Sequence, residues 1–544
     1  MSVKFGESGG RTFFSILTVS LLLALNYLYR NSYPFFRVEA ALLWLAIFLF
    51  LLLPYLLCRA FKCEWAVYAF LSLLLADLST GCAHGIYLWA KNGASFHKWA
   101  GIAAVSLAAT AFFWVVCKAR GFMERFFTPA TVVAVLASAL SPVVMPLPLY
   151  TSSSRPLTPI RADKPDIFFI ILDEHIGFAG IPEEIPGAGD LKQTLIERYE
   201  KKGFNLYEKA YSNYGATMDS IPSIVNARLY PKRREEVKHK VLRVNRLFDK
   251  LAAEGYRLNV YQSGHPDFSR SIGAKPDKLF TYRSTSTGYL APLPLSVGAK
   301  TRVLLSHFIG SGKSRPLKKF FHVLTGGHRT NENVMTGALA VDRILQEVKK
   351  DATQETRGTF FFIHLLLPHS SYVFDSGCGL LDPSLWEECN AAPDEDVSVV
   401  NSAESRLRKY PLYFGQAQCA HRKLGDLFES LRQEGIYEGS AIVITADHGS
   451  RIFLTVPTEA NRDRLTPSDW TSAYSAFLAI KTEGATDGQG SVNREPTPLM
   501  KVIGEFFGLL SGDDLDRPDL FKVYLQKDDD LTSFFEADPP NFSR

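Results

Sequence analysis

The chain has 544 residues, a formal net charge of +4 at pH 7 and a mean hydropathy of zero. A charge this small and evenly spread excludes the basic stripe that a nucleic-acid partner requires. The average hydropathy hides a strong asymmetry, because the apolar residues are concentrated in the N-terminal part.

Five apolar runs fill the first 150 residues, and each is about long enough to cross a hydrocarbon core at roughly 1.5 Å per residue. They are Phe13–Tyr29, Val38–Cys58, Trp65–Ala90, Trp99–Cys117 and Phe127–Tyr150. A cleavable signal peptide has one short apolar run before a small-residue cleavage site. Five successive runs therefore predict a transmembrane bundle of about five helices over residues 1–150, with the lipid bilayer as a partner.

The basic residues indicate an orientation, because Lys and Arg tend to remain in cytoplasmic loops. With the N-terminus inside, the inner segments hold Lys4, Arg11, Arg59, Lys62, Lys118, Arg120 and Arg125, and the outer loops hold Arg30, Arg37, Lys91 and Lys98. Arg155, Arg161 and Lys164 beyond the fifth run oppose this bias. We predict a multi-pass protein of a bacterial-type inner membrane, with everything after Tyr150 in an extracytoplasmic, periplasmic domain.

The remaining chain begins with a predicted linker over residues 151–165, which is rich in Ser, Thr and Pro. Residues 166–510 then alternate between strand-like apolar runs and helical patterns, which predicts parallel pairing and an α/β sandwich. We expect strands at Asp166–Leu172, Leu258–Tyr261, Phe360–Leu367, Ala441–Thr445 and Ala476–Ile480, and helices at Leu191–Lys202, Asn245–Glu254, Asn331–Lys350 and Leu412–Glu434. The acidic residues 511–544 predict a solvated tail.

Three cysteines, Cys378, Cys389 and Cys419, belong to the predicted extracytoplasmic part. In an oxidising compartment, one interpretation is a bridge between Cys378 and Cys389 that leaves Cys419 free. The sequence alone does not fix the pairing.

Three predicted strands run directly into acidic residues or histidines. Asp173-Glu174-His175 follow the first strand, Asp447-His448-Gly449 follow AIVIT, and Pro368-His369 follow FFFIHLLL. The carboxyl ends of parallel strands converge on one crevice, where a cluster of carboxylates would repel itself unless a divalent cation relieved the repulsion. A single such residue is often a simple cap or turn residue, but three loaded strand ends favour a metal site.

The motifs ILDEH, HLLLPH and ADHG together resemble the alkaline phosphatase superfamily in its sulfatase-like branch. That branch includes sulfatases, lipid A phosphoethanolamine transferases and lipoteichoic acid synthases, which transfer phosphoethanolamine or phosphoglycerol. The two transferase groups also resemble this chain in having five transmembrane helices before an extracytoplasmic catalytic domain. The resemblance implies the alkaline phosphatase/sulfatase-like α/β fold and a metal-dependent enzyme.

The nucleophile is expected in Tyr211–Asn226, where Thr217-x-x-Ser220-x-Pro222 matches the pattern around the nucleophilic threonine of the phosphoethanolamine transferases. Thr217 is the first choice, and Ser220 is the fallback nucleophile or a substrate contact. The alternative is a plain helix start, since Thr, Asp and Ser commonly initiate helices. Sulfatases proper use Cys/Ser-x-Pro-x-Arg, and here Ile224 replaces the arginine.

By the same resemblance, one ion is expected among the residues Asp173, Glu174, Thr217, Asp447 and His448, with Glu174 as a ligand or an orienting group. Mixed Asp, His and Thr ligation favours Zn²⁺ or Mn²⁺ over Ca²⁺, which remains an alternative.

His369 matches a histidine that faces the substrate in this family, whereas His364 is expected to be a core histidine. His265 and Arg451 are weaker candidates for substrate binding, with a turn and a surface charge as their alternatives. The transferases carry a further histidine after the ADHG motif, but this chain has none beyond His448.

The sequence thus predicts a membrane-anchored transferase that moves a phosphoryl-linked headgroup from a phospholipid donor to an envelope lipid or glycan through a covalent Thr217 intermediate. One alternative is a sulfuric or phosphoric ester hydrolase of the same fold. Another is an inactive binding or scaffold homologue.

Overall fold

The computed structural model describes residues 7–60, 148–155, 163–230, 242–264, 266–311, 336–354, 357–386, 401–527 and 533–539. The chain divides into two compact units, one formed by residues 1–149 and 285–334 and the other by residues 150–284 and 335–544. The sequence-based boundary after residue 150 stays a prediction. The second unit, however, is interrupted by an insertion that belongs to the first.

The first unit contains α1 (Glu7–Arg30) and α2 (Val38–Ala60), which cover the first two predicted apolar runs, and α10 (Val297–Ser311) from the insertion, which packs against α2. The carbonyl oxygen of Asn31, between α1 and α2, accepts hydrogen bonds from Ser286 Oγ and from Gly288 N at 2.8 Å. Within the ranges given above, no helix combines the length and the hydropathy that a membrane crossing needs. The predicted runs at 65–90 and 99–117, and residues 127–147 of the fifth, lie outside those ranges.

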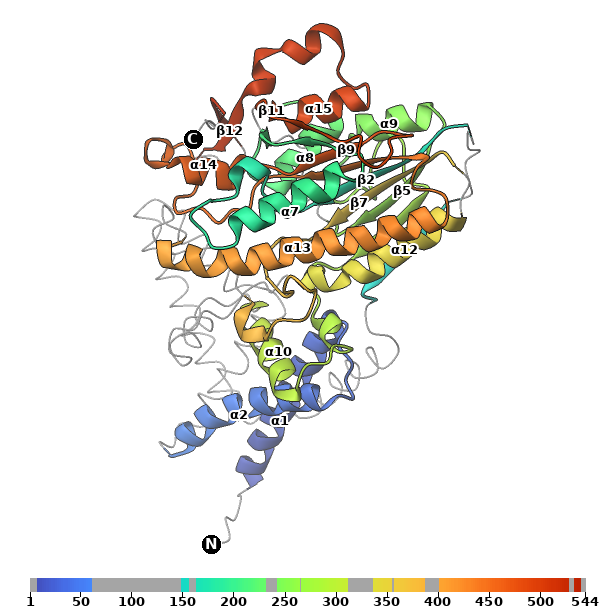
Figure 1. Cartoon of the computed structure of the whole chain (residues 1–544). Helices are drawn as coiled ribbons and strands as arrows, with labels where there is room; N and C mark the ends of the chain where they lie inside the picture. The colour runs from blue at the N-terminus through green and yellow to red at the C-terminus, as the bar shows by residue number, and fades with distance from the viewer. Residues whose placement is uncertain are drawn as a thin grey trace. The chain divides into compact units, whose positions relative to one another are not determined.

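The second unit is built on a nine-stranded sheet with the order β1-β6-β5-β7-β2-β8-β9-β3-β10 (Figure 1). In chain order the strands are β1 (Tyr150–Ser154), β2 (Asp166–Leu172), β3 (Asn205–Tyr207), β5 (Arg257–Gln262), β6 (Lys278–Tyr282), β7 (Thr359–Leu365), β8 (Ser440–Ala446), β9 (Leu478–Lys481) and β10 (Ser491–Asn493). Strands β5, β7, β2 and β8 are parallel, as predicted, and β6, which was not predicted, is parallel to β5.

The strands β3, β6 and β10 were not predicted, and β9 and β1 differ from the prediction in their pairing. β9 pairs antiparallel with β8, so the sheet is mixed rather than wholly parallel. β1 occupies the start of the expected linker, where Tyr150–Ser154 pair antiparallel with β6. Because β1 is an edge strand with four exposed residues, its composition resembles that of a linker and conceals the pairing.

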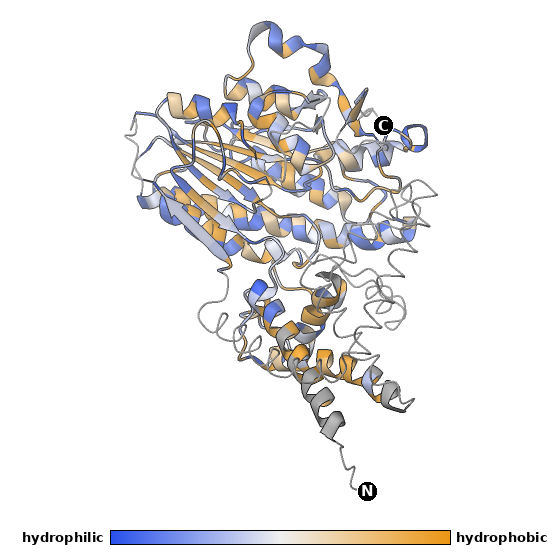
Figure 2. Cartoon of the chain, turned by 180° about the vertical axis from the view of Figure 1, so that it is seen from behind, coloured by the Kyte–Doolittle hydropathy of each residue, from blue (hydrophilic) through white to orange (hydrophobic). Residues whose placement is uncertain are grey.

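Helices cover both faces of the sheet. α7 (Ala188–Glu200), α12 (Val341–Gln354) and α13 (Ala403–Gln433) lie on one face, and α8 (Thr217–Asn226), α9 (Arg246–Ala253) and α15 (Leu499–Phe506) lie on the other (Figure 1). Aromatic rings fill the second interface, where Phe507 packs on Phe169 and Phe360. The strands are accordingly mostly hydrophobic in Figure 2, as expected for a sheet buried on both faces.

The predicted C-terminal tail is wrong for the residues that the structure describes. Short 3-10 helices at Gly512–Asp516 and Pro518–Phe521 lead into a hairpin of β12 (Val523–Gln526) and β13 (Phe534–Ala537). Val523 and Leu525 are fully buried in a cluster with Tyr211, Phe453 and Tyr474. The sequence pattern did not reveal this hairpin, because each strand has only four residues and the surrounding stretch is acidic.

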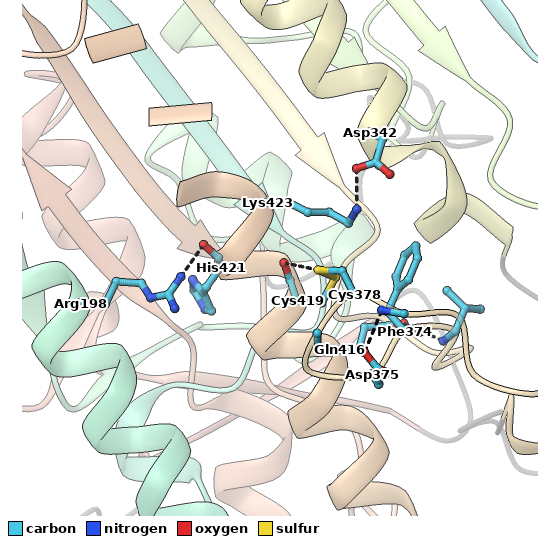
Figure 3. The surroundings of a disulfide bond; sticks show 12 residues. Arg198, Asp342, Phe374, Asp375, Cys378, Gln416, Cys419, His421 and Lys423 are labelled. Atoms are coloured by element: carbon cyan, nitrogen blue, oxygen red, sulfur yellow. Dashed lines mark hydrogen bonds and ion pairs between the residues drawn. A yellow bond between two sulfur atoms is a disulfide. The ribbon is translucent and has the colours of Figure 1, made fainter. Parts of the chain in front are cut away.

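The predicted cysteine pairing is also wrong. Cys378 is joined to Cys419 of α13, with Cα atoms 5.0 Å apart (Figure 3). Cys419 is fully buried on the side of α13 that faces the loop carrying Cys378. The two cysteines are 41 positions apart in the sequence but adjacent in space. Cys389 lies outside the described residues.

Candidate functional site

The site is built where three neighbouring strands end. β7, β2 and β8 are adjacent and parallel, so the residues that follow them meet at one edge of the sheet. Atoms of Asp173, Glu174 and His448 that could each ligate a metal lie within 4.8 Å of one another, and all three residues are buried.

Three carboxylate oxygens at this site are buried without a hydrogen-bond partner among the described residues: Asp173 Oδ1, Glu174 Oε2 and Asp447 Oδ2. Burying a charged oxygen without a partner is costly, and buried carboxylates are normally paired or bound to a metal. The grouped atoms of Asp173, Glu174 and His448 fit a divalent cation, and Asp447 Oδ2 lies 3.2 Å from His448 Nε2.

His448 presents its free ring nitrogen to the same place. Its Nδ1 lies 3.0 Å from the carbonyl oxygen of Gly449, which can only accept, so Nδ1 carries the proton. In the neutral ring Nε2 then holds a lone pair, and it lies 3.2 Å from both Asp447 Oδ2 and Thr217 Oγ1. An unprotonated imidazole nitrogen beside carboxylate oxygens is a typical metal ligand.

Backbone hydrogen bonds fix the turn that carries Glu174. The other oxygen of Asp447, Oδ1, accepts from the backbone N–H groups of Glu174 and His448, each at 3.0 Å. Glu174 has a φ of +61°, a left-handed conformation that is uncommon for a residue with a side chain. The strand-end loops of β2 and β8 are thereby joined by Asp447 itself.

His364 is part of the site, although the sequence predicts a core histidine. On β7 it lies opposite Ile171 of β2, which puts its ring on the same face as Asp173. Its Nε2 is 3.0 Å from Asp173 Oδ2, which leaves Oδ1 unpaired. Burial opposes ionisation of Asp173, but the hydrogen bond from His364 and the nearby histidines outweigh it and hold the pKa of Asp173 well below its usual value.

Thr217 is the first residue of α8 and is only partly buried, so its hydroxyl is accessible beside His448. The positive end of the helix dipole at this position favours negative charge. Ser220, one turn later, is fully buried, and its hydroxyl bonds to the carbonyl of Asp447 at 2.5 Å and to Ser212 Oγ at 2.8 Å. Ser220 thus anchors α8 to the loop after β8, whereas the Thr217 hydroxyl lies beside His448.

His369 and Arg451 lie at the edge of the candidate metal site, and we call them the rim residues. Their Nε2 and Nη1 atoms lie 3.4 Å and 3.6 Å from Glu174 Oε1, and the Arg451 side chain is 38% exposed. Burial lowers the pKa of His369, but the carboxylates of Glu174 and Asp173 exceed this effect and raise the pKa above its usual value. An imidazole with a raised pKa and a guanidinium therefore border the candidate metal site. His265 lies outside the described residues.

Comparison with protein families gives a match to the sulfatase model over residues 188–475, more than half of the chain. The chain belongs to the sulfatase family. Enzymes of this family depend on a metal, and the chain is an enzyme of ester-hydrolase or phosphotransferase type. The matched region runs from α7 to the end of α14 (Pro467–Tyr474) and contains Thr217, His369, Asp447 and His448.

A comparison with curated proteins gave no significant match. Among solved structures, the phosphonate monoester hydrolase of Agrobacterium radiobacter is 11% identical with a TM-score of 0.38, over 63% of this chain and 74% of that one. A protein in the alkaline phosphatase superfamily from Vibrio parahaemolyticus is 13% identical with a TM-score of 0.38, over 74% of this chain and 82% of that one. The family assignment rests on the sequence match.

Sequence reasoning missed two further residues that contact the site, both on α13. Tyr413 and Gln416 are buried and bond to the backbone of the loops that carry Glu174 and His369. The signal available in the sequence was a pair of polar residues three positions apart in a long helical pattern, which predicts a shared face but no partner.

Proposed function

We propose that this sulfatase-family enzyme is a membrane-anchored phosphotransferase that moves a phosphoryl-linked headgroup from a phospholipid to an envelope lipid or glycan. The observation that carries the proposal is the position of the Thr217 hydroxyl, 3.2 Å from His448 Nε2, a candidate metal-ligand atom that groups with buried oxygens of Asp173 and Glu174. A threonine at this position argues against sulfatase chemistry proper, which requires an oxidised cysteine or serine.

Asp173, Glu174, Asp447 and His448 would hold the cation, with Thr217 adjacent to it. Their mixture of carboxylate and imidazole groups favours Zn²⁺ or Mn²⁺, with Ca²⁺ as the alternative. Such a cation supplies positive charge that lowers the pKa of a neighbouring hydroxyl and stabilises charge on phosphoryl oxygens.

The remaining roles fall to the rim residues. Arg451 is positioned to hold the non-reacting phosphoryl oxygens of an anionic substrate. His369, whose pKa is raised by Glu174 and Asp173, is suited to donate a proton to a leaving oxygen. The positive N-terminal end of α8 favours the same phosphoryl group.

The Thr217 hydroxyl would first release its proton to solvent beside the bound cation. In the first half-reaction its oxygen forms a bond to phosphorus, and the bond from phosphorus to the oxygen of the lipid leaving group breaks. His369 gives its proton to that leaving oxygen. In the second half-reaction the acceptor hydroxyl gives its proton to His369, and its oxygen displaces the Thr217 oxygen from phosphorus.

The membrane anchor is part of the proposal, with residues 1–150 and their apolar runs in a bilayer. The α1–α2 loop supports the topology, because it bonds to Ser286 and Gly288, which belong to an insertion in the catalytic part of the chain. That loop would therefore lie on the extracytoplasmic side, as the basic-residue bias predicts. The Cys378–Cys419 disulfide supports the same compartment, since disulfides persist outside the cytoplasm.

The experiment uses the purified full chain in detergent, loaded with Zn²⁺ or Mn²⁺ and given phospholipid with a labelled headgroup. A transferase passes the label to an added glycolipid, and the Thr217→Ala variant does not. Release of the label only into water would contradict the transferase proposal and favour the ester hydrolase, which the sulfatase-family match supports as the second candidate. Turnover by Thr217→Ala at the wild-type rate would contradict both.

A further inference from the structure

One helix, α13, bonds to all three loops that carry the candidate site. Its buried polar residues Tyr410, Tyr413 and Gln416 recur every three positions and so share one face. Each is directed at a different part of the site, and none is needed as a metal ligand or nucleophile in the proposed reaction.

Gln416 holds the loop that carries His369. Its Nε2 donates to the carbonyl oxygens of Pro368, His369 and Ser371 at 3.2, 2.8 and 3.3 Å. Its Oε1 accepts from the backbone N–H groups of Val373 and Phe374 at 2.8 and 3.3 Å. The side chain is fully buried, so water does not replace these bonds when it is removed.

Tyr413 holds the turn that carries Glu174. Its hydroxyl donates to the carbonyl oxygen of Glu174 at 2.9 Å and accepts from the N–H of Ile176 at 2.7 Å. Glu174 is the residue with a φ of +61°, so its backbone needs external bonds to remain in this conformation.

Two further residues of α13, Tyr410 and Cys419, bond to the loop after β8 and to the continuation of the His369 loop. Tyr410 Oη bonds to Ser472 Oγ at 2.8 Å and to Ser450 Oγ at 3.4 Å, next to Arg451. Cys419, three residues after Gln416, bonds covalently to Cys378 in the continuation of the His369 loop, and Figure 3 shows Gln416 beside this connection.

We propose that α13 positions the reactive groups of this site, with Gln416 aligning His369 as proton donor and Tyr413 fixing Glu174 as metal ligand. The inference rests on the proposed function for the roles of His369 and Glu174, and it assigns Gln416 and Tyr413 as positioning residues.

Gln416 is tested with two phosphodiesters that differ only in their leaving group, 4-nitrophenol or phenol. A proton donor matters more for the more basic phenol, so Gln416→Met slows the phenol ester at least about 10-fold more than the nitrophenol ester. The ratio of the two rates does not depend on how much of the variant is folded. Gln416→Glu, which keeps the acceptor atoms for Val373 and Phe374 but loses the donor to His369, shows the same change in ratio.

Gln418→Met is the matched control, since Gln418 lies on the same helix and is only partly buried. It leaves the ratio unchanged. Equal slowing of both esters by Gln416→Met, or no slowing, overturns the assignment of Gln416.

Tyr413 is tested by titration of the metal-free full chain with Zn²⁺ alone, which requires no turnover. Tyr413→Phe weakens Zn²⁺ binding about 10-fold, the effect expected when the support of a ligand is removed. Tyr437→Phe removes another buried hydroxyl, which bonds to the carbonyl oxygen of Lys202 and precedes β8, whereas Asp447 follows the other end of that strand; this variant leaves the affinity unchanged. Unchanged Zn²⁺ affinity in Tyr413→Phe overturns this half of the proposal, whereas failure of the wild type to bind Zn²⁺, Mn²⁺ or Ca²⁺ overturns the proposed function itself.

Discussion

Asp173 shows how far a single residue can be assigned from sequence. Its place after a buried apolar run predicted a ligand at a strand end, and the structure puts its unpaired Oδ1 among the other candidate ligands. The role of His364 could not be predicted, because it depends on the register between β2 and β7 rather than on any local pattern. Only that register brings the ring within 3.0 Å of Asp173.

Replacing His364 with phenylalanine removes the hydrogen bond to Asp173 Oδ2 and leaves a buried carboxylate without support. We expect the dissociation constant for Zn²⁺ to rise about 10- to 100-fold, as is typical when the partner of a metal ligand is lost. Calorimetric titration of the metal-free protein with Zn²⁺ measures this dissociation constant. The melting temperature of the metal-free protein serves as the control for folding, and an unchanged Zn²⁺ affinity would show that His364 has no such role.

We expect a substitution of Thr217 to reduce turnover and a substitution of Ser220 to reduce stability. Thr217→Ala removes the proposed nucleophile and lowers kcat/KM at least about 1,000-fold with little change in melting temperature. Ser220→Ala removes the bond between α8 and the Asp447 carbonyl and costs about 1–3 kcal/mol of unfolding free energy. Phosphodiester turnover and thermal unfolding of both variants check this. Complete inactivity of a well-folded Ser220→Ala with an active Thr217→Ala would exchange the two roles.

At the scale of elements, the sequence identified the central strands because each is a continuous apolar run, and β2 agrees with its predicted bounds. The start of α13 was missed by nine residues, since Ala403–Pro411 contains a proline and few apolar residues. That first part of the helix is stabilised by Ser402, whose side chain accepts from the N–H of Ser405, and by packing that only the fold provides. The predicted helix therefore included only part of the α13 face that contacts the site loops.

Gly449 sets the approach of the β8 loop to α14. A Cβ atom at this position would lie 2.3 Å from the carbonyl oxygen of Ser472, so Gly449→Ala forces the backbone apart. We expect a loss of about 1–3 kcal/mol in stability together with weakened metal binding, because His448 precedes this glycine. Gly189→Ala is the matched control, as its Cβ would meet nothing within 4 Å and its φ is not positive. Equal melting temperatures for the two variants would contradict the close approach.

A buried chain of rings joins α7, α13 and the turn after β2. Tyr199 Oη donates to His421 Nδ1 at 2.6 Å, His421 Nε2 lies 2.7 Å from His175 Nε2, and His175 Nδ1 donates to the carbonyl of Ile176 at 2.8 Å. Only one proton fits between the two Nε2 atoms, so both rings are neutral. Burial lowers the pKa of His175 to about 4 and that of His421 well below its usual value.

These pKa shifts predict a dependence of stability on pH. Below about pH 6.5 histidines of the unfolded chain bind protons that the folded chain does not take up until about pH 4. The free energy of unfolding therefore decreases as the pH is lowered through this window. The contribution of His175 is roughly 3 kcal/mol at the acid end. Melting temperatures of the wild type and of His175→Phe/His421→Phe between pH 4.5 and 7.5 test it. The double variant should show the flatter profile, and parallel profiles would contradict the account.

At the scale of the whole molecule, the chain enters the first unit twice, once at its N-terminus and again between Ser284 and Met335. No sequence pattern predicted this insertion. The contacts of Asn31 with Ser286 and Gly288 join residues that are more than 250 positions apart, and such contacts leave no local pattern. The predicted boundary near residue 150 therefore described only one of the connections between the units.

The proposed topology predicts that the α1–α2 loop is extracytoplasmic. Phe36 in this loop is 99% exposed, so Phe36→Cys should react with a membrane-impermeant maleimide in intact cells above the background of the parent chain. Cysteines placed in an outer loop are labelled from outside, and those placed inside are labelled only after lysis. Labelling of Phe36→Cys only after lysis would reverse the proposed orientation.

The central claim is that Thr217 carries a covalent phosphoryl intermediate beside a metal site. The most direct measurement is mass spectrometry of the metal-loaded full chain after rapid acid quenching during turnover of a phosphodiester. We expect a phosphoryl-linked group on Thr217 that appears with substrate and is absent without the metal. Turnover with no modified residue, or modification of Ser220 while Thr217 stays free, would contradict it.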